Sequence, residues 1–162
     1  MEKKPFVTLA QAEEIAKTYP TPFYLYDEKG IRENVKRLKQ AFSWNKGYKE
    51  YFAVKATPNP FILKILQEYG CGTDCSSLTE LMMSKACGFS GSNVMFSSND
   101  TPPEEFAYAE KLGAIINLDD FTQIQVLEDT LGYIPETISC RFNPGGRSVM
   151  ILWAILEMQS MV

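Results

Sequence analysis

One lysine stands where it could act as a nucleophile. The segment YFAVKATPNP, residues 51–60, places Lys55 at the end of an apolar run that is typical of a strand, and two prolines follow almost at once. Lysine is rarely buried without a partner. Burial lowers the pKa of an amine, and a neutral amine can attack a carbonyl group. The segment therefore predicts a reactive amine at Lys55, with a side chain that extends past the strand end into solvent as the structural alternative.

Other polar side chains stand at the ends of strand-like segments farther along the chain. Asp74 lies within GTDCSS, Ser98 and Asn99 follow NVMF, and Arg141 lies within ISCRF. An arginine between apolar strand residues needs an anionic or acceptor partner, which favours a functional role. The alternative for Asp74 is to satisfy nearby backbone donors, and the alternative for Ser98 and Asn99 is a turn.

Composition narrows the classes of protein. The net charge of −4 and the isoelectric point near 5.0 argue against a general nucleic-acid binder. The 162 residues include no histidine, which removes Ser-His and Cys-His catalysis and the commonest zinc ligand. The four cysteines lack paired metal-ligand spacing, so we expect no metal site and reduced thiols in a cytoplasmic protein.

No membrane segment is expected either. The N-terminal lysines are not followed by an apolar run, as a signal peptide would require. The apolar run SVMILWAIL, residues 148–156, falls far short of the roughly 20 residues that span a bilayer.

The elements that must position the polar residues alternate along the chain. Strand-like segments of about five residues are followed by helical segments, which predicts parallel strands joined by βαβ crossovers. The predicted strands are residues 50–56, 72–77, 93–98, 114–118 and 136–142, and the predicted helices are 59–70, 77–88, 101–113 (with Thr101 as N-cap) and 120–132. Ahead of them, residues 21–27 are predicted as a strand and residues 31–42 as a helix.

This pattern favours a barrel over a Rossmann sheet, because the sequence has neither GxGxxG nor GxxxxGK[ST]. The predicted fold is α/β, a partial (β/α)8 TIM-type barrel of about five strands. Its predicted divisions are a lead-in strand and helix (1–48), five βα units (49–146) and an aberrant tail (147–162). In a barrel, chemistry gathers where strands end, and Lys55, Asp74, Asn99 and Arg141 are all expected there.

Four blocks of the sequence resemble the diaminopimelate decarboxylases. These blocks are FAVKATPNP, GCGTDCSSLTEL, FSSNDTPPEEFAYAEKLGAIINLDDF and SCRFNPGG, and TPFYLYD resembles the segment that precedes the barrel. The resemblance runs from about Thr21 to Gly146. That family uses pyridoxal phosphate on an alanine-racemase-like barrel, and ornithine and arginine decarboxylases belong to the same group.

The resemblance implies roles for individual residues. Lys55 would form the internal Schiff base with pyridoxal 5′-phosphate, Asp74 would lie near the cofactor, and Arg141 would face it. Glu80 stands where ornithine decarboxylases keep a glutamate close to the active lysine, although glutamates are common on helix surfaces. Ser98 and Asn99 are further candidates for the pocket.

The implied reaction is decarboxylation of meso-2,6-diaminopimelate to L-lysine, with a small amino acid as substrate and a homodimer as the full-length enzyme. Two alternatives stay open. One is another enzyme of the group, namely an arginine, ornithine or carboxynorspermidine decarboxylase or an amino-acid racemase. The other is a non-enzymatic fragment that pairs with intact subunits.

The family pattern stops near residue 146. A complete enzyme of the family has three more barrel strands and a β-domain, so we expect this chain to be truncated and inactive alone, with an unpaired edge on its fifth strand. The tail RSVMILWAILEMQSMV, back-translated and read from the third base of each codon, gives ISNDFMGNPGDAKYG with permitted codons. That string resembles the family segment after FNPGG, which predicts a frameshift near codons 145–147.

Overall fold

The computed structural model describes residues 4–142 and 152–157 and divides into two compact units, Met1–Trp44 and Asn45–Val162. The first unit holds two helices, α1 (Leu9–Thr18) and α2 (Glu28–Ala41). At the start of α1, Thr8 Oγ1 accepts from the Gln11 N–H at 3.3 Å, and Gln11 Oε1 accepts from the Thr8 N–H at 2.8 Å. This capping box satisfies two donors that a helix start leaves open.

The strand predicted for residues 21–27 is wrong. These residues form no strand ladder, and Tyr24 is 89% exposed. Aromatic residues favour strands only where a neighbouring strand and a buried face receive them, and here neither is present. The helix predicted over 31–42 is confirmed, and it begins earlier, at Glu28, where the Asp27 carboxylate accepts from the Gly30 N–H at 3.0 Å.

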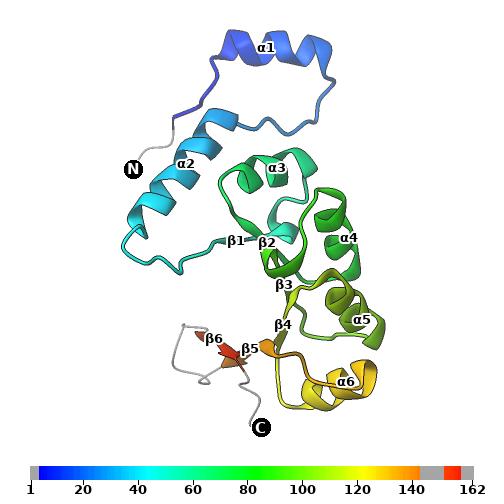
Figure 1. The fold of residues 1–162 in the computed structure, drawn as a ribbon. Helices are drawn as coiled ribbons and strands as arrows, with labels where there is room; N and C mark the ends of the chain where they lie inside the picture. Colours follow the sequence, from blue (N-terminus) through cyan, green and yellow to red (C-terminus); the bar gives the residue numbers. More distant parts are fainter. Residues whose placement is uncertain (1–3, 143–151, 158–162) are drawn as a thin grey trace, which may run out of the picture. The chain divides into compact units, whose positions relative to one another are not determined.

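The second unit is a six-stranded sheet in the order β1-β2-β3-β4-β5-β6 (Figure 1). Its strands are β1 (Tyr51–Ala53), β2 (Gly72–Cys75), β3 (Val94–Ser97), β4 (Ile115–Leu118), β5 (Thr137–Phe142) and β6 (Leu152–Glu157). Its helices are α3 (Pro60–Glu68), α4 (Leu78–Ala86), α5 (Pro103–Leu112) and α6 (Thr122–Leu131), with short 3-10 turns η1 (Val54–Ala56) and η2 (Gly91–Asn93). Strands β1 to β5 pair in parallel, which confirms the predicted five-stranded partial barrel.

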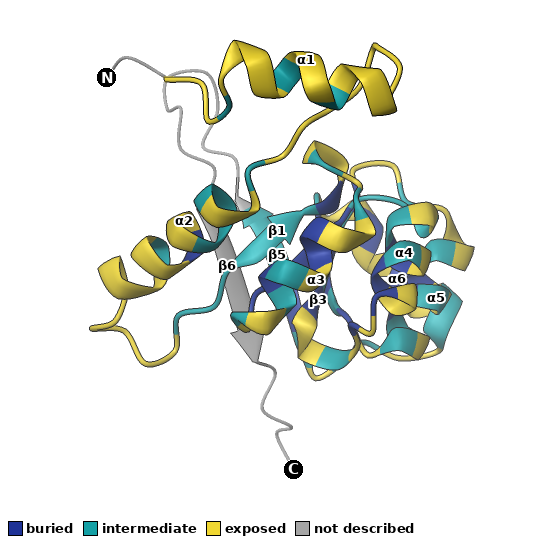
Figure 2. Cartoon of the chain, turned by 90° about the horizontal axis from the view of Figure 1, so that it is seen from above, coloured by how far each residue is buried: buried dark blue, intermediate teal, exposed yellow. Residues whose placement is uncertain are grey.

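The core lies between the strands and helices α3 to α6, where Figure 2 shows the buried residues. Phe96 of β3 and Phe106 of α5 are both fully buried, and their rings meet edge to face with centroids 6.2 Å apart. Helices α5 and α6 end at Gly113 and Gly132, which take the left-handed conformation that glycine adopts without strain.

Helix α5 corrects one predicted detail. Its N-cap is Pro102 rather than Thr101, and no side chain caps it. Pro103 restricts the preceding residue to extended backbone, so Pro102 must be the flanking residue and Thr101 lies one position too early. The Thr101 Oγ1 atom is buried and has no hydrogen-bond partner in the described part of the chain.

The unpaired edge predicted for the fifth strand is also wrong. β6 pairs antiparallel with β5 along the whole strand, from Thr137 opposite Glu157 to Phe142 opposite Leu152. Nine residues separate the two strands in the sequence, and a parallel partner needs a crossover of a dozen or more. An apolar run this close to β5 can therefore reach its edge only as an antiparallel strand.

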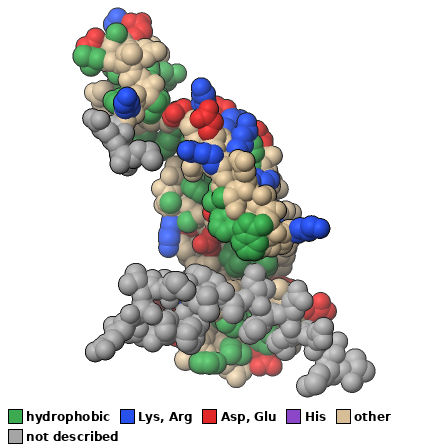
Figure 3. Space-filling model, turned by 90° about the vertical axis from the view of Figure 1, so that its left-hand side faces the viewer, with side chains coloured by type: hydrophobic (Ala, Val, Ile, Leu, Met, Phe, Trp, Pro, Cys, Tyr) green, Lys and Arg blue, Asp and Glu red, His purple; other side chains and the backbone are tan. Residues whose placement is uncertain are grey.

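The surface carries charges of both signs. On the face in Figure 3, lysine and arginine side chains are interspersed with aspartate and glutamate. Two such pairs lie on α2, where Arg32 Nε contacts Glu28 at 2.7 Å and Lys29 contacts Glu33 at 3.8 Å. Among the residues that the structure describes, no helix combines the length and apolar character needed to cross a bilayer.

The four cysteines are free, as predicted. Burial raises the pKa of the Cys75 thiol to about 11, and its sulfur lies 3.1 Å from the Ser84 hydroxyl. Since a thiolate is the reactive form, burial makes Cys75 an inert core residue. Groups of metal-binding side chains are absent from the described residues.

Candidate active site

The sheet of the second unit has one apolar face and one polar face. Core residues such as Phe96 and Ile116 alternate along the strands with polar residues, because successive strand side chains point to opposite faces. The polar set is Asp74 on β2, Ser97 on β3, Asn117 on β4 and Ser139 on β5, and the last three are register partners across the sheet. The face opposite the helices is therefore lined with hydrogen-bonding groups.

Lys55 lies just beyond this face, on the η1 turn that follows β1. Val54 beside it is fully buried and anchors the turn, whereas Lys55 is exposed. The burial that the apolar lead-in predicts thus stops one residue short of the lysine, because the strand ends at Ala53 and the chain turns. Ala53 is the register partner of Asp74, which places the lysine near that carboxyl group.

Asp74 is half-buried and belongs to a small electrostatic cluster. Burial raises the pKa of its carboxyl group above the ordinary value. The hydrogen bond from Ser97 Oγ, 2.7 Å from Asp74 Oδ1, and the positive charge of Lys55 oppose that rise, while the negative charge of Glu80 adds to it. Lys55 and Glu80 are thus each close enough to Asp74 for their charges to act on its carboxyl group.

We expect Asp74→Asn to stabilise the second unit at neutral pH. A carboxyl group whose folded pKa is raised contributes stability below its unfolded pKa of about 3.9, and that contribution is lost as the pH rises through the folded pKa. Asparagine keeps the oxygen that accepts from Ser97 but carries no charge. In urea unfolding from pH 3 to pH 7, the free energy of unfolding of the variant should increase relative to that of the natural chain as the pH rises. The exposed change Asp129→Asn is the control for loss of one charge, and an equal gain there would contradict the assignment.

Glu80 caps the turn between β2 and α4. Its carboxylate accepts from the Ser76 N–H at 2.9 Å and from the Ser76 hydroxyl at 3.1 Å, while the Ser77 hydroxyl accepts from the Glu80 N–H at 3.4 Å. A glutamate in the first turn of a helix also complements the helix dipole. These contacts give Glu80 the structural role that the sequence left open, and its place in a pocket stays a prediction.

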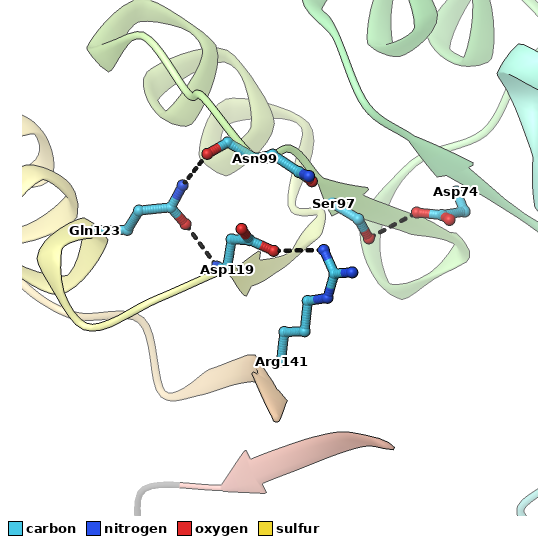
Figure 4. Close-up of polar contacts among 6 residues, drawn as sticks. All are labelled: Asp74, Ser97, Asn99, Asp119, Gln123 and Arg141. Carbon is cyan, nitrogen blue, oxygen red and sulfur yellow. Dashed lines mark hydrogen bonds and ion pairs between the residues drawn. The ribbon is translucent and has the colours of Figure 1, made fainter. Parts of the chain in front are cut away.

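Arg141, at the end of β5, has the acidic partner that its position predicts. Its Nη1 lies 2.7 Å from Asp119 Oδ1, directly after β4, and the two side chains are only 22% and 23% exposed (Figure 4). A half-buried, hydrogen-bonded pair of this kind fixes both side chains in place.

A second hydrogen-bonded chain leads away from Asp119. The Gln123 side chain accepts from the Asp119 N–H at 2.6 Å and donates to the Asn99 carbonyl oxygen at 3.2 Å (Figure 4). The Asn99 side chain is exposed and Ser98 is buried. The structure thus joins the loops after β3 and β4 to Arg141, whereas the role of the Asn99 and Ser98 side chains in a pocket stays a prediction.

Sequence reasoning did not select Ser97, Asp119 or Gln123. The signal for Asp119 was available, since it follows the predicted strand at residues 114–118 as Arg141 ends the next one. Ser97 was hidden inside its strand, and Gln123 lay in an ordinary helical segment.

A small cleft lies beside Arg141. It is lined by Leu118, Asp120, Phe121, Ile124, Cys140 and Arg141 and has a volume of about 80 Å³. Pockets that enclose a cofactor are several times larger, from about 300 Å³ upward. The cleft is therefore too small to enclose a cofactor.

Comparison with known proteins places these residues in a family. Residues 28–151 match the model of the pyridoxal-dependent decarboxylases, specifically their pyridoxal-binding domain. The chain is 39% identical over 134 residues to protein TabA of Pseudomonas amygdali pv. tabaci, covering 83% of this chain and 31% of that protein. It is 36% identical over 138 residues to diaminopimelate decarboxylase of Methanothermobacter thermautotrophicus, covering 83% and 32%.

Solved structures agree with the sequence comparison. The crystal structure of Helicobacter pylori diaminopimelate decarboxylase, in complex with L-lysine, superposes with a TM-score of 0.68 at 32% identity and covers 74% of this chain and 30% of that one. The chain therefore spans about a third of the length of the relatives it matches. With its parallel strands and the lysine after β1, it belongs to the pyridoxal-dependent decarboxylase family, whose pyridoxal-binding domain it matches over residues 28–151.

Proposed function

We propose that this chain supplies the lysine-bearing part of an amino-acid decarboxylase that uses pyridoxal phosphate and acts on meso-2,6-diaminopimelate to give L-lysine. The observation that carries the proposal is the arrangement of Lys55, Asp74 and Arg141. They lie at or beyond the carboxyl ends of β1, β2 and β5 in one parallel sheet, which is where barrel enzymes gather their chemistry.

The chemistry of these side chains fits the cofactor. Pyridoxal phosphate carries an aldehyde group, which a primary amine can attack. The cofactor is also anionic, which suits a site that contains a guanidinium group. Lys55 is exposed and therefore accessible to the aldehyde. When bound, the cofactor supplies an electron sink for the pair left behind as the α-carboxylate departs as CO2.

The other residues set the environment of the amine. Asp74 places a carboxyl group within electrostatic reach of Lys55, and Ser97 orients that carboxyl through its 2.7 Å hydrogen bond. Glu80 fixes the turn that follows β2. Arg141 is held by Asp119 at the far side of the sheet, where it provides a positive charge.

The proposed substrate rests on similarity to named relatives. The decarboxylases of Methanothermobacter thermautotrophicus and Thermoplasma acidophilum, both named for diaminopimelate, are 36% and 32% identical to this chain. The chain is also 39% identical to protein TabA, whose name states no substrate, so other amino acids belong in the test.

The substrate is tested on a chain completed by the coding sequence that continues the family pattern. Such a chain, supplied with pyridoxal phosphate, should release CO2 from meso-2,6-diaminopimelate and form L-lysine, with arginine, ornithine and L-lysine as comparison substrates. Faster release from one of the comparison substrates would overturn the assignment. Mixing the 162-residue chain with an intact diaminopimelate decarboxylase tests the non-enzymatic alternative, which requires a change in that enzyme's rate.

A further inference from the structure

Arg141 is held in place by a relay of hydrogen bonds that begins on another element. Its Nη1 donates to Asp119 Oδ1 at 2.7 Å, and Asp119 in turn donates its backbone N–H to Gln123 Oε1 at 2.6 Å. Figure 4 shows the side chain of Gln123 reaching from the start of α6 to the loop that carries Asp119. The position of the carboxylate therefore depends on how this loop is fixed.

Gln123 is built into the fold rather than resting on its surface. The side chain is only 7% exposed, and both ends of its amide are used. The oxygen accepts from Asp119, and the nitrogen donates to the Asn99 carbonyl in the loop after β3. A buried amide whose oxygen and nitrogen each have a partner favours that orientation, because the flipped orientation turns each atom away from its partner.

We propose that Gln123 is a positioning residue, which fixes the loop after β4 so that Asp119 holds the Arg141 guanidinium toward the cofactor. The relation to the cofactor rests on the function proposed above, while the relay itself is a property of the chain. The acceptor oxygen of Gln123 is the important half, since it alone contacts Asp119. The donated bond to Asn99 holds the amide in the orientation that presents this oxygen.

Two substitutions separate the halves. Gln123→Met keeps the length and volume of the side chain but removes both hydrogen bonds. Gln123→Glu keeps an oxygen that can accept from the Asp119 N–H, but it replaces the donor by a carboxylate oxygen that faces the Asn99 carbonyl. The matched control is Gln125→Met on the same helix, where the glutamine is exposed and donates to Asp129 at 2.9 Å.

The readout is the reactivity of Arg141 itself, measured on the 162-residue chain without cofactor. Phenylglyoxal modifies arginine side chains, and peptide mass spectrometry gives the rate at Arg141, with the exposed Arg37 as internal reference. We expect Gln123→Met to raise the rate at Arg141 by about threefold to tenfold, the equivalent of one hydrogen bond. Amide exchange at Asp119 should accelerate alongside it. Gln123→Glu should raise the rate less than Gln123→Met does, because it keeps the acceptor, and Gln125→Met should stay close to the natural chain.

Each result decides the inference. An unchanged Arg141 rate in Gln123→Met, while Asp119→Ala raises it, overturns the role of Gln123. Equal increases in the Met and Glu variants overturn the importance of the acceptor oxygen. If Gln123→Met does not fold, Gln123→Glu is compared with Asp119→Ala, which removes the acceptor for Arg141. Gln123→Glu should then raise the Arg141 rate less than Asp119→Ala does, and an equal increase overturns the importance of the acceptor oxygen. A positive relay in a chain whose Lys55 never takes up pyridoxal phosphate would leave this inference standing and refute the proposed function.

Discussion

Changing Lys55 to alanine should abolish the site-specific attachment of pyridoxal phosphate. In the natural chain, incubation with the cofactor followed by borohydride reduction should leave its mass on the peptide that contains Lys55. Lys55 stands at the carboxyl end of β1, the edge where the proposed function places the cofactor, so the adduct at this position should exceed that at other exposed lysines. We expect an excess of at least about tenfold, which corresponds to about 1.4 kcal/mol.

Two further variants make the result specific. Lys55→Arg should fail as completely as Lys55→Ala, because a guanidinium group stays protonated and cannot attack an aldehyde. Lys64→Ala is the matched control, since Lys64 is exposed on α3 and should leave the Lys55 adduct unchanged. If the Lys55→Ala chain attaches as much cofactor as the natural chain, on its remaining lysines, the assignment is wrong.

Sequencing the DNA for the last codons should recover a family segment in a second reading frame. We propose that the DNA for residues 147–162 encodes ISNDFMGNPGDAKYG in the original reading frame and is translated here in a shifted frame. Four amino acids of that string are the same whichever codons are chosen. The junction Met150-Ile151 gives GAT (aspartate), and the junction Trp153-Ala154 gives GGC (glycine). Met158-Gln159 gives GCA (alanine), and Met161-Val162 gives GGT (glycine).

The four forced amino acids fall in register with the family segment that this string resembles, and a segment evolved for another purpose has no reason to show such agreement. The antiparallel pairing of β6 supports the same proposal, because a sixth βα unit of a barrel would add a parallel strand. The shifted frame should continue into histidine-containing and glycine-rich cofactor motifs. A gene repaired by one small insertion or deletion near codons 145–147 should encode an active decarboxylase, whereas a downstream region without those motifs in any frame would refute the proposal.

Hydrophobic periodicity was enough to predict the five parallel strands and the helices between them. Buried runs such as Val94–Ser97 are short and β-prone, and glycines such as Gly113 mark where the helices end. The predictions failed where a neighbour decides the structure. Residues 21–27 look like a strand but have no partner, and the tail pairs with β5 because that edge was open to it.

Part of the candidate site could also be predicted from the sequence. Lys55, Asp74 and Arg141 could be selected because each stands at a predicted strand end. Gln123 could not, because its partner Asn99 lies 24 residues away and the contact depends on how the loops converge in three dimensions. Asp119 follows a predicted strand and could have been selected, but its pairing with Arg141, 22 residues away, depends on the same convergence. The exposure of Lys55 also depends on the turn at Val54–Ala56, which an apolar lead-in does not reveal.

The strand β6 has a consequence for any attempt to complete this chain in trans. The edge of β5 that faces away from β4 is already paired with Leu152–Glu157 from Thr137 to Phe142. A separately expressed piece carrying the next parallel strand would compete for the same backbone groups and would have to displace β6 before docking. Complementation should therefore be slow and strand-exchange limited, and it should accelerate when the chain is shortened to end before Leu152.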